Sequence, residues 1–182
     1  MKRTVSIVLK SESPLLMNKF PLTPHPPGFD KRPAAEQAEA CCYRNAEGKL
    51  CAPGVNIYRG LISAANFVKW RGKATCWRPV ASSFHVTPDE IEFDTQQYEV
   101  LTLPIRNAVS GGRVLKHRPM LKTWSLAFDL SWEEALLSEA QVKEIVSNLG
   151  SLVGLFDYRP ENSGPYGRCC IASWKLKKES KA

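Results

Sequence analysis

Two kinds of hydrophobic periodicity alternate along this chain, and their order restricts the possible folds more than any single motif does. Apolar residues alternate with polar ones in several segments, a pattern typical of half-buried strands. These strand-like segments are residues 4–9, 84–86, 91–93, 98–103, 123–130 and 169–176. Helical spacing of apolar residues over 57–70 and 139–149 instead predicts two helices, each with one face in the core. The order is therefore strand, helix, strands, helix, strand.

Capping residues mark the ends of both predicted helices. Asn56 precedes the first helix and is suited to cap its N-terminus, while Gly72 lies just past its end. Ser138 is positioned to cap the second helix, and Gly150 is expected to end it.

This order of elements predicts an α+β domain. With insertions removed at about residues 21–52 and 71–122, it is the split-βαβ, ferredoxin-like order, an antiparallel sheet with two packing helices that RNA-recognition domains also use. Within the first insertion we expect a loop with five prolines over 21–33, a short helix over 34–40 and a hairpin around 45–48. The 182 residues suffice for one domain, which we expect to span the whole chain.

The chain is basic, with a net charge of +7. Such an excess favours a polyanionic partner, although charge does not by itself fix a function. No run approaches the roughly 20 apolar residues of a membrane span. The first ten residues alternate like a strand and lack the long apolar region of a secretory signal. We therefore expect an intracellular, cytoplasmic protein without a membrane partner.

Six cysteines stand at positions 41, 42, 51, 76, 169 and 170. They form no CxxC motif, and no Cys/His pair has the spacing of a zinc site. The pattern predicts free thiols that act as small core residues in a reducing compartment, with disulfides or zinc as the alternative. We expect neither a metal ion nor another cofactor.

A basic stretch without acids runs from Leu103 to Thr123, with Gly111-Gly112 near its middle. A flexible loop of this composition can project as a finger and follow a phosphate backbone, because Arg offers forked donors and Lys a point charge. The alternative is a solvated surface loop. The candidate nucleic-acid contacts here are Arg106, Arg113, Lys116, His117, Arg118 and Lys122.

A second basic group follows the first predicted helix and includes two tryptophans, Trp70 and Trp77. Basic residues beside indoles suit single strands, since bases stack on the rings while cations hold the backbone. Alternatively, both tryptophans are core or hairpin supports. The cations of this group are Lys69, Arg71, Lys73 and Arg78.

A third candidate is the glycine-containing segment over residues 154–168, which joins the second helix to the last strand. Its glycines allow close backbone approach to a ligand, and its aromatic and basic side chains can grip a nucleotide strand. These side chains are Tyr158, Arg159, Tyr166 and Arg168. It is not a phosphate-binding Walker loop, because no Gly-Lys-Ser/Thr follows. Alternatively, it is a structural turn in which Asp157 pairs with Arg159 or Arg168.

The acids gather near the second helix, and we expect this acidic group to point away from an anionic ligand. Its members are Asp129, Glu133, Glu134, Glu139 and Glu144. Sets of catalytic residues are sparse: the three histidines lie in unrelated segments, and common hydrolase motifs are missing. Asp30 and His117 are the catalytic candidates, for phosphodiester cleavage. Alternatively, Asp30 pairs with Lys31 or Arg32.

Three of these segments together resemble a known family. The run Pro53-Gly54-Val55-Asn56-Ile57-Tyr58-Arg59-Gly60 is similar to the start of the first helix in the RAMP proteins that form the backbone of CRISPR effector complexes. The loop over residues 154–167 is similar to the glycine loop of that superfamily. The basic segment around Gly111-Gly112 occupies the position of the thumb-like hairpin of that superfamily. The short chain looks most like the small RAMP-like proteins of phages and prophages.

The resemblance implies a modified RNA-recognition fold whose members assemble as filaments along a guide RNA. It also implies that Lys19, Arg59 and the thumb residues contact the nucleic-acid backbone. The chain departs from the family in its shortness and in the sparser glycines of its loop.

Three hypotheses about function follow. The first is a module that binds single-stranded nucleic acid, with RNA favoured over DNA, and that can form multimers. The second is a metal-dependent RAMP-type ribonuclease that uses Asp30 or His117. The third is a phage factor that associates with an RNA-guided complex by mimicking its backbone subunit. The motifs favour a binding protein over an enzyme.

Overall fold

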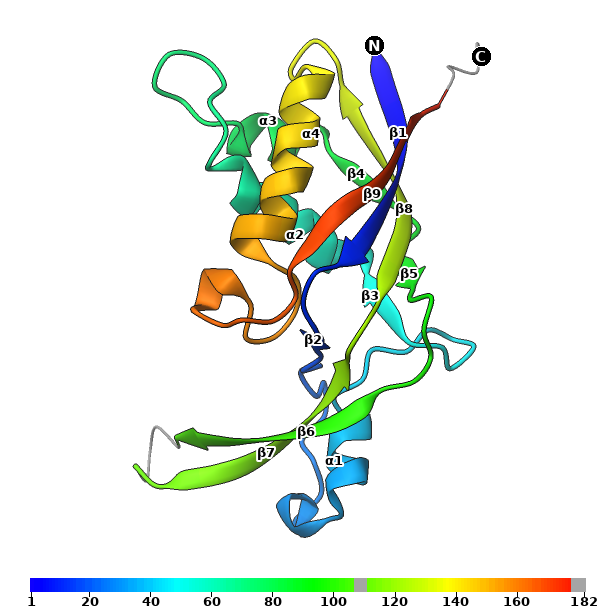
Figure 1. Ribbon diagram of the computed structural model, residues 1–182, viewed down its shortest axis with the longest axis vertical. Helices are drawn as coiled ribbons and strands as arrows, with labels where there is room; N and C mark the ends of the chain where they lie inside the picture. The colour runs from blue at the N-terminus through cyan, green and yellow to red at the C-terminus, as the bar shows by residue number, and fades with distance from the viewer. Residues whose placement is uncertain (107–110, 178–182) are drawn as a thin grey trace.

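The computed structural model describes residues 1–106 and 111–177, and its largest sheet has four antiparallel strands (Figure 1). In spatial order these are β4 (His85–Thr87), β8 (Ser125–Glu133), β1 (Lys2–Ser11) and β9 (Cys169–Leu176). Each strand coincides, within a few residues, with a segment predicted from its alternation. The α+β class is therefore confirmed.

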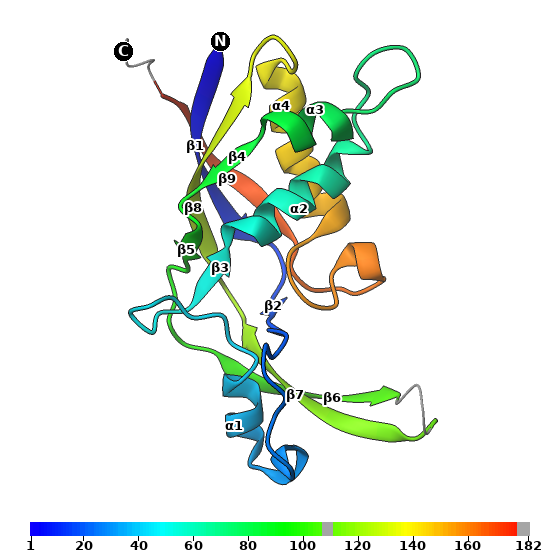
Figure 2. The ribbon, with the colours of Figure 1, turned by 180° about the vertical axis from the view of Figure 1, so that it is seen from behind.

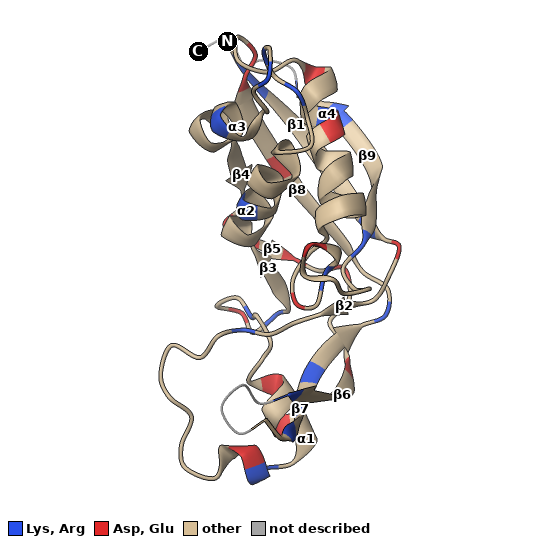
Figure 3. Ribbon diagram, turned by 90° about the vertical axis from the view of Figure 1, so that its left-hand side faces the viewer, with Lys and Arg blue, Asp and Glu red and all other residues tan. Residues whose placement is uncertain are grey.

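Three helices pack on one face of this sheet and lie in front of it in Figure 3. They are α2 (Gly54–Ala65), α3 (Trp77–Ser83) and α4 (Glu139–Asn148). The sequence predicted α2 and α4 but not α3. Pro79 lies in the first turn of α3, where a missing N–H costs little, so the proline is compatible with this short helix.

The two faces of the sheet differ as the alternation requires. Register pairs Val5 with Leu130 and Ile7 with Phe128, and all four side chains are buried against the helices. The opposite face carries smaller or polar side chains: Ser6, Val8, Ala127 and Asp129.

The ends of α2 differ from the prediction. Pro53, not Asn56, occupies the N-cap position, and Asn56 lies in the first helical turn. The amide of Gly54 donates to the Asp89 carbonyl at 2.6 Å, so a tertiary bond serves the first turn in place of a side-chain cap. Because the helix ends at Ala65, Gly72 lies in a separate turn, with a φ of 57°.

The N-terminal cap of α4 is as predicted, but the C-terminal end of the helix is not. Ser138 and Gln141 form a reciprocal capping box. Gly150 does not end the helix, which continues as a π-helical turn over Leu149–Val153 and stops at Gly154, with a φ of 74°. Gly150 serves packing instead, because a Cβ there would lie 1.9 Å from the Cys169 carbonyl oxygen.

The basic stretch 103–123 was predicted as a loop, and the structure shows most of it as a β-hairpin. β6 (Glu99–Arg106) and β7 (Arg113–Leu121) pair in continuous register, and β2 (Leu15–Leu16) joins the free side of β7. The hairpin projects from the end of the molecule opposite the N-terminus (Figures 1 and 2). Residues 107–110, within the basic stretch, lie outside the described residues, as does the chain after 177.

The first predicted insertion packs around the base of this hairpin. It contains a 3-10 turn (Phe29–Lys31) and α1 (Ala34–Glu39), which contacts β6 and β7. The hairpin predicted around residues 45–48 is present as a turn closed by a bridge between Arg44 and Leu50. The following strand, β3 (Cys51–Pro53), pairs with β5 (Glu90–Glu92) rather than within that hairpin.

All six cysteines are free thiols, and Cys42, Cys51, Cys76 and Cys169 are buried as predicted. Cys41 is partly exposed and Cys170 is exposed, so a core role is wrong for Cys170. No helix among the described residues is long and apolar enough to cross a bilayer.

Candidate nucleic-acid interface

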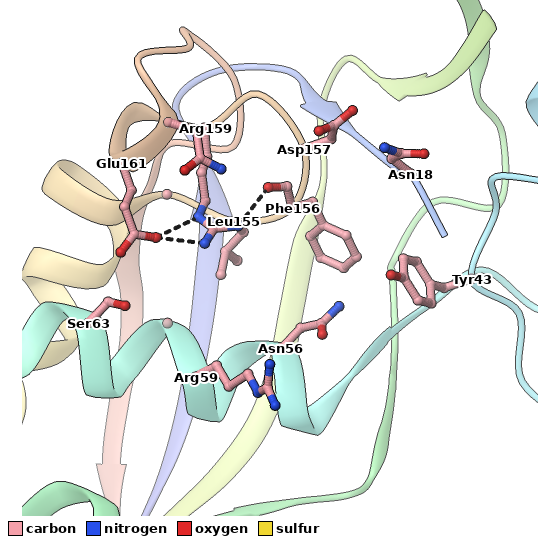
Figure 4. Close-up of a pocket in the computed structure, with 13 residues that line it drawn as sticks. Asn18, Tyr43, Asn56, Arg59, Ser63, Leu155, Phe156, Asp157, Arg159 and Glu161 are labelled. Carbon is pink, nitrogen blue, oxygen red and sulfur yellow. Dashed lines mark hydrogen bonds and ion pairs between the residues drawn. The ribbon is translucent and has the colours of Figure 1, made fainter. Parts of the chain in front are cut away.

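A cleft of about 450 Å³ separates the first half of α2 from the glycine loop, which we define as residues 154–167 (Figure 4). Asn56, Arg59 and Ser63 line it from α2, and Phe156 and Arg159 line it from the glycine loop. The lining also includes residues that the sequence did not suggest, among them Asn18 and Tyr43. Asn18 precedes Lys19, which the family resemblance implies as a nucleic-acid contact. This neighbouring position is the one signal in the sequence that could have pointed to Asn18.

The glycine loop is held in an unusual backbone conformation. Phe156, Tyr158 and Ser163 have φ values of 65°, 49° and 60°, in the left-handed region that non-glycine residues seldom occupy. The described chain has no other non-glycine residue in this region. Such residues gather at ligand sites, where the surrounding structure must enforce them.

Backbone hydrogen bonds to β2 and to the residue just before it hold the loop in this conformation. The amide of Asp157 donates to the Leu16 carbonyl at 3.0 Å, and the amide of Gly167 donates to the Pro14 carbonyl at 2.7 Å. The loop is also closed on itself: a Cβ at Gly164 would lie 1.8 Å from the Tyr158 carbonyl oxygen. The loop is therefore a rigid wall of the cleft.

Most charges around the cleft neutralise one another. Arg159 donates to the Glu161 carboxylate at 2.6 Å and to the Phe156 carbonyl at 3.0 Å (Figure 4). Burial raises the pKa of Glu161, but hydrogen bonds from Arg159 and Ser63 outweigh it and hold that pKa below its ordinary value. Arg159, predicted as a nucleic-acid contact, is therefore largely occupied in holding the loop.

Asp157 is paired as well, but with neither of the two partners considered from the sequence. Nε of Arg118 lies 3.4 Å from Oδ2 of Asp157, and the Arg118 side chain is only 12% exposed. Arg168 donates instead to the Ser151 carbonyl. Arg118 was predicted to contact the nucleic-acid backbone. In the structure its side chain instead links β7 to the glycine loop.

Arg59 is the exception among these charges. It is exposed on α2, and its side chain makes no hydrogen bond or ion pair with any residue of the described chain. Among the described charged residues that line the cleft, it alone has no partner in the described chain for its donors.

The hairpin supplies further cations, some of them without a described partner and some of them paired. Arg106, Arg113 and Lys116 are exposed and have no hydrogen-bonding or ion-pair partner among the described side chains. Lys122 pairs with Glu99 at 2.8 Å, and His117 shares a 2.8 Å hydrogen bond with Thr102. Three of the six predicted contacts in this stretch are therefore available to a ligand.

The remaining predicted aromatic and basic residues lie around these elements. Tyr158 and Tyr166 of the glycine loop form a tilted ring pair, 6.0 Å between centroids. Lys19 follows β2, and its amide donates to the Cys41 carbonyl at 3.0 Å. The group over residues 69–78 lies beyond the far end of α2, at the end of the molecule remote from the hairpin (Figure 1).

Two members of the predicted acidic group lie away from the hairpin, but the helix that carries others lies beside the 69–78 group. Glu133 pairs with the N-terminal amine and Glu134 with Arg3, both at the end remote from the hairpin. Gln141 of α4 donates to the Lys69 carbonyl at 3.0 Å, so the acidic helix and the second basic group are neighbours.

The two catalytic candidates show no contact with each other. Asp30 is exposed in the 3-10 turn, and His117 is on β7. Arg32 pairs with Glu36 at 3.5 Å, not with Asp30. Among the described residues, no three His, Cys, Asp or Glu side chains gather as potential metal ligands.

We compared the chain with protein-family models and with curated proteins. No family model and no curated protein matches it.

Proposed function

We propose that this protein holds single-stranded nucleic acid, RNA in preference to DNA, by its backbone in the cleft between α2 and the glycine loop. The observation that carries the proposal is Arg59, an unpaired guanidinium on the wall of a cleft whose other charges are neutralised. A guanidinium with free donors favours a phosphate, which it can bind through two parallel hydrogen bonds. Asn18, Asn56 and Ser63 add neutral polar groups suited to sugar and phosphate oxygens.

We further propose that the scaffold is a ferredoxin-like, RRM-like domain of the RAMP type. The sheet order β4-β8-β1-β9, with α2 before β4 and α4 before β9, supports this because the split-βαβ arrangement places its strands in that order. The first turn of α2, the glycine loop and the hairpin are the three segments of the family resemblance, and α2 and the loop meet at the cleft.

The sheet itself supports contact through the backbone rather than through stacked bases. An RNA-recognition sheet stacks bases on aromatic side chains of its open face. Here the face opposite the helices carries Ser6, Val8, Ala127 and Asp129, while Phe128 and Trp132 point into the core. Binding on the helical side through phosphates would be tolerant of sequence.

Fluorescence anisotropy with a labelled 20-nucleotide single-stranded RNA, and with the matching DNA, tests the proposal. We expect Arg59→Gln to weaken binding by about tenfold and to lower the slope of log affinity against log salt by about 0.7, the value for one phosphate contact. Lys10→Gln is the matched control, because Lys10 is an exposed cation on the opposite face of the sheet. Equal affinities for wild type, Arg59→Gln and Lys10→Gln would refute the assignment of the cleft, and no binding by wild type would refute the function.

A further inference from the structure

A second cavity lies just beyond the C-terminal end of α2, in the 69–78 group. It measures about 290 Å³ and is lined by Trp70, Lys73, Ala74, Thr75, Trp77 and Arg78. Two indoles and two cations thus share one small cavity, and no acidic residue belongs to this described lining. This composition differs from the cleft, whose lining includes Asp157 and Glu161.

The turn that forms one wall of the cavity is fixed at several points. The amide of Trp70 donates to the Ala74 carbonyl at 2.9 Å, and Lys69 and Thr75 form a β-bridge around it. The indole Nε1 of Trp70 donates to the Leu136 carbonyl at 2.9 Å, which ties the turn to the approach of α4. The cavity is therefore built by the fold, with Trp70 as its anchored wall.

Two cations of this group, Arg71 and Arg78, lie over the indole rings. The Arg71 guanidinium carbon is 4.8 Å from the Trp70 ring centroid, and that of Arg78 is 5.2 Å from the Trp77 centroid. The side chains of Arg71, Lys73 and Arg78 make no hydrogen bond or ion pair with any described residue. A stacked guanidinium still presents N–H groups at its edge, where a phosphate oxygen can accept them.

We propose that this cavity, which we call the tryptophan pocket, binds a single nucleotide. The base stacks on the indole of Trp77, which is 41% exposed, and Lys73 and Arg78 bind its phosphate. An acidic peptide would use the cations but not the flat indole walls, so an aromatic anion fits the lining better. The inference rests on the proposed function for the class of ligand and adds a second, separate contact.

The placement of the two cavities is consistent with one strand reaching both. The cleft lies along the first turns of α2 and the tryptophan pocket lies beyond its last turn. The 12 residues of α2 span about 18 Å at the rise of an α-helix. A nucleotide in the tryptophan pocket would therefore fix the register of a strand whose backbone crosses the cleft.

The indole N–H signals of the ¹⁵N-labelled full-length protein test the proposal directly. The Trp77 signal is assigned by its loss in Trp77→Phe, and the protein is titrated with adenosine monophosphate, with adenosine and with inorganic phosphate. We expect the monophosphate to shift the Trp77 signal at lower concentration than either fragment does. Lys73→Gln combined with Arg78→Gln should weaken this binding by about tenfold or more. Trp77→Ala removes the Trp77 signal, so its binding is followed on the Trp70 indole signal and should weaken by about 5- to 100-fold.

Lys143→Gln is the matched control, because Lys143 also lies over an indole, 5.9 Å from the Trp174 centroid, but Trp174 bonds Glu139 and is not part of the tryptophan pocket. Its affinity for the monophosphate should equal that of wild type. Two results would overturn the proposal: an unshifted Trp77 signal at saturating monophosphate, or an equal response to a polyglutamate peptide. Arg59→Gln separates the two sites, because it should lose affinity for the 20-nucleotide strand while binding the monophosphate like wild type.

Discussion

Arg118 and Asp157 join the hairpin to the glycine loop through an ion pair, with Nε of Arg118 lying 3.4 Å from Oδ2 of Asp157. The same guanidinium donates to the Cys41 sulfur at 3.5 Å. Three segments far apart in the sequence therefore meet at one largely buried cation. This contact therefore fixes the base of the hairpin relative to the glycine loop that lines the cleft.

Replacement of Arg118 should destabilise the protein. Arg118→Ala leaves the Asp157 carboxylate without its ion-pair partner, and we expect a loss of about 1.5–3 kcal/mol, the usual value for hydrogen bonds to charged groups. For a chain of this size each kcal/mol lowers the melting temperature by about 2–4 °C. Lys122→Ala is the control: it breaks an ion pair whose partners are 63% and 59% exposed, and should cost less than about 1 kcal/mol. Equal losses in urea unfolding would contradict a structural role for Arg118.

Features encoded by local sequence could be predicted, and features set by distant contacts could not. Ser138 and Gln141 are three residues apart, so their capping box follows from the sequence alone. Arg118 and Asp157 are 39 residues apart, and the sequence offered Arg159 and Arg168 as nearer partners for the same carboxylate. Arg118 therefore looked like a ligand contact until the fold placed it beside Asp157.

The candidate site, too, could be predicted from the sequence only in part. Arg59 could be proposed from its motif, but its availability depends on where Arg159 and Glu161 pair, which only the folded loop determines. Gly150 has the position of a helix terminator, yet its role is contact with Cys169 of β9. Glycine marks both a helix end and a close approach, and the sequence does not separate the two.

Gly150→Ala should be among the most destabilising single substitutions in this chain. Its Cβ would lie 1.9 Å from the backbone oxygen of Cys169, so the π-helical turn and β9 must separate. We expect a loss of more than about 3 kcal/mol in urea unfolding, the range of severe overpacking. Gly48→Ala is the control: its φ is 80° with no atom within 4 Å, so it should cost only the left-handed strain of about 1–2 kcal/mol. A smaller loss for Gly150→Ala than for Gly48→Ala would contradict the packing role.

The Arg159–Glu161 pair should make stability depend on pH in the acidic range. The folded-state pKa of Glu161 lies below its ordinary value, so the folded protein holds this proton more weakly than the unfolded chain does. The resulting stabilisation is complete above the unfolded pKa of about 4.3 and is lost as pH falls through the folded pKa. The difference in unfolding free energy between wild type and Glu161→Gln should therefore be constant near neutral pH and shrink below about pH 4. A difference that does not change with pH would argue against the pair.

The adjacent thiols Cys169 and Cys170 should differ sharply in reactivity. Burial, with smaller contributions from Cys170 and Glu12, raises the pKa of Cys169 to about 12, whereas Cys170 is exposed. A buried, protonated thiol is a poor nucleophile at pH 8. In a titration of the native protein with a disulfide reagent, Cys170→Ser should remove the fastest phase and Cys169→Ser should retain it. Loss of that phase in Cys169→Ser alone would reverse the assignment.

Arg106 and Arg113 face each other across the hairpin, and their replacement should affect stability and binding in opposite directions. They are directly opposed in the register of β6 and β7, and like charges at opposed positions repel. A bound phosphate would relieve this repulsion. Arg113→Thr should therefore stabilise the free protein by about 0.2–1 kcal/mol while weakening its affinity for single-stranded RNA.

Replacing Arg106, Arg113 and Lys116 together by Gln should weaken RNA binding further and make it less dependent on salt. The slope of log affinity against log salt should fall by about 2, because each lost phosphate contact on a single strand contributes about 0.7. Lys175→Gln, an exposed cation on β9, is the control and should leave the slope unchanged. A triple variant with the wild-type slope would place the hairpin outside the nucleic-acid interface, even if Arg59→Gln weakens binding.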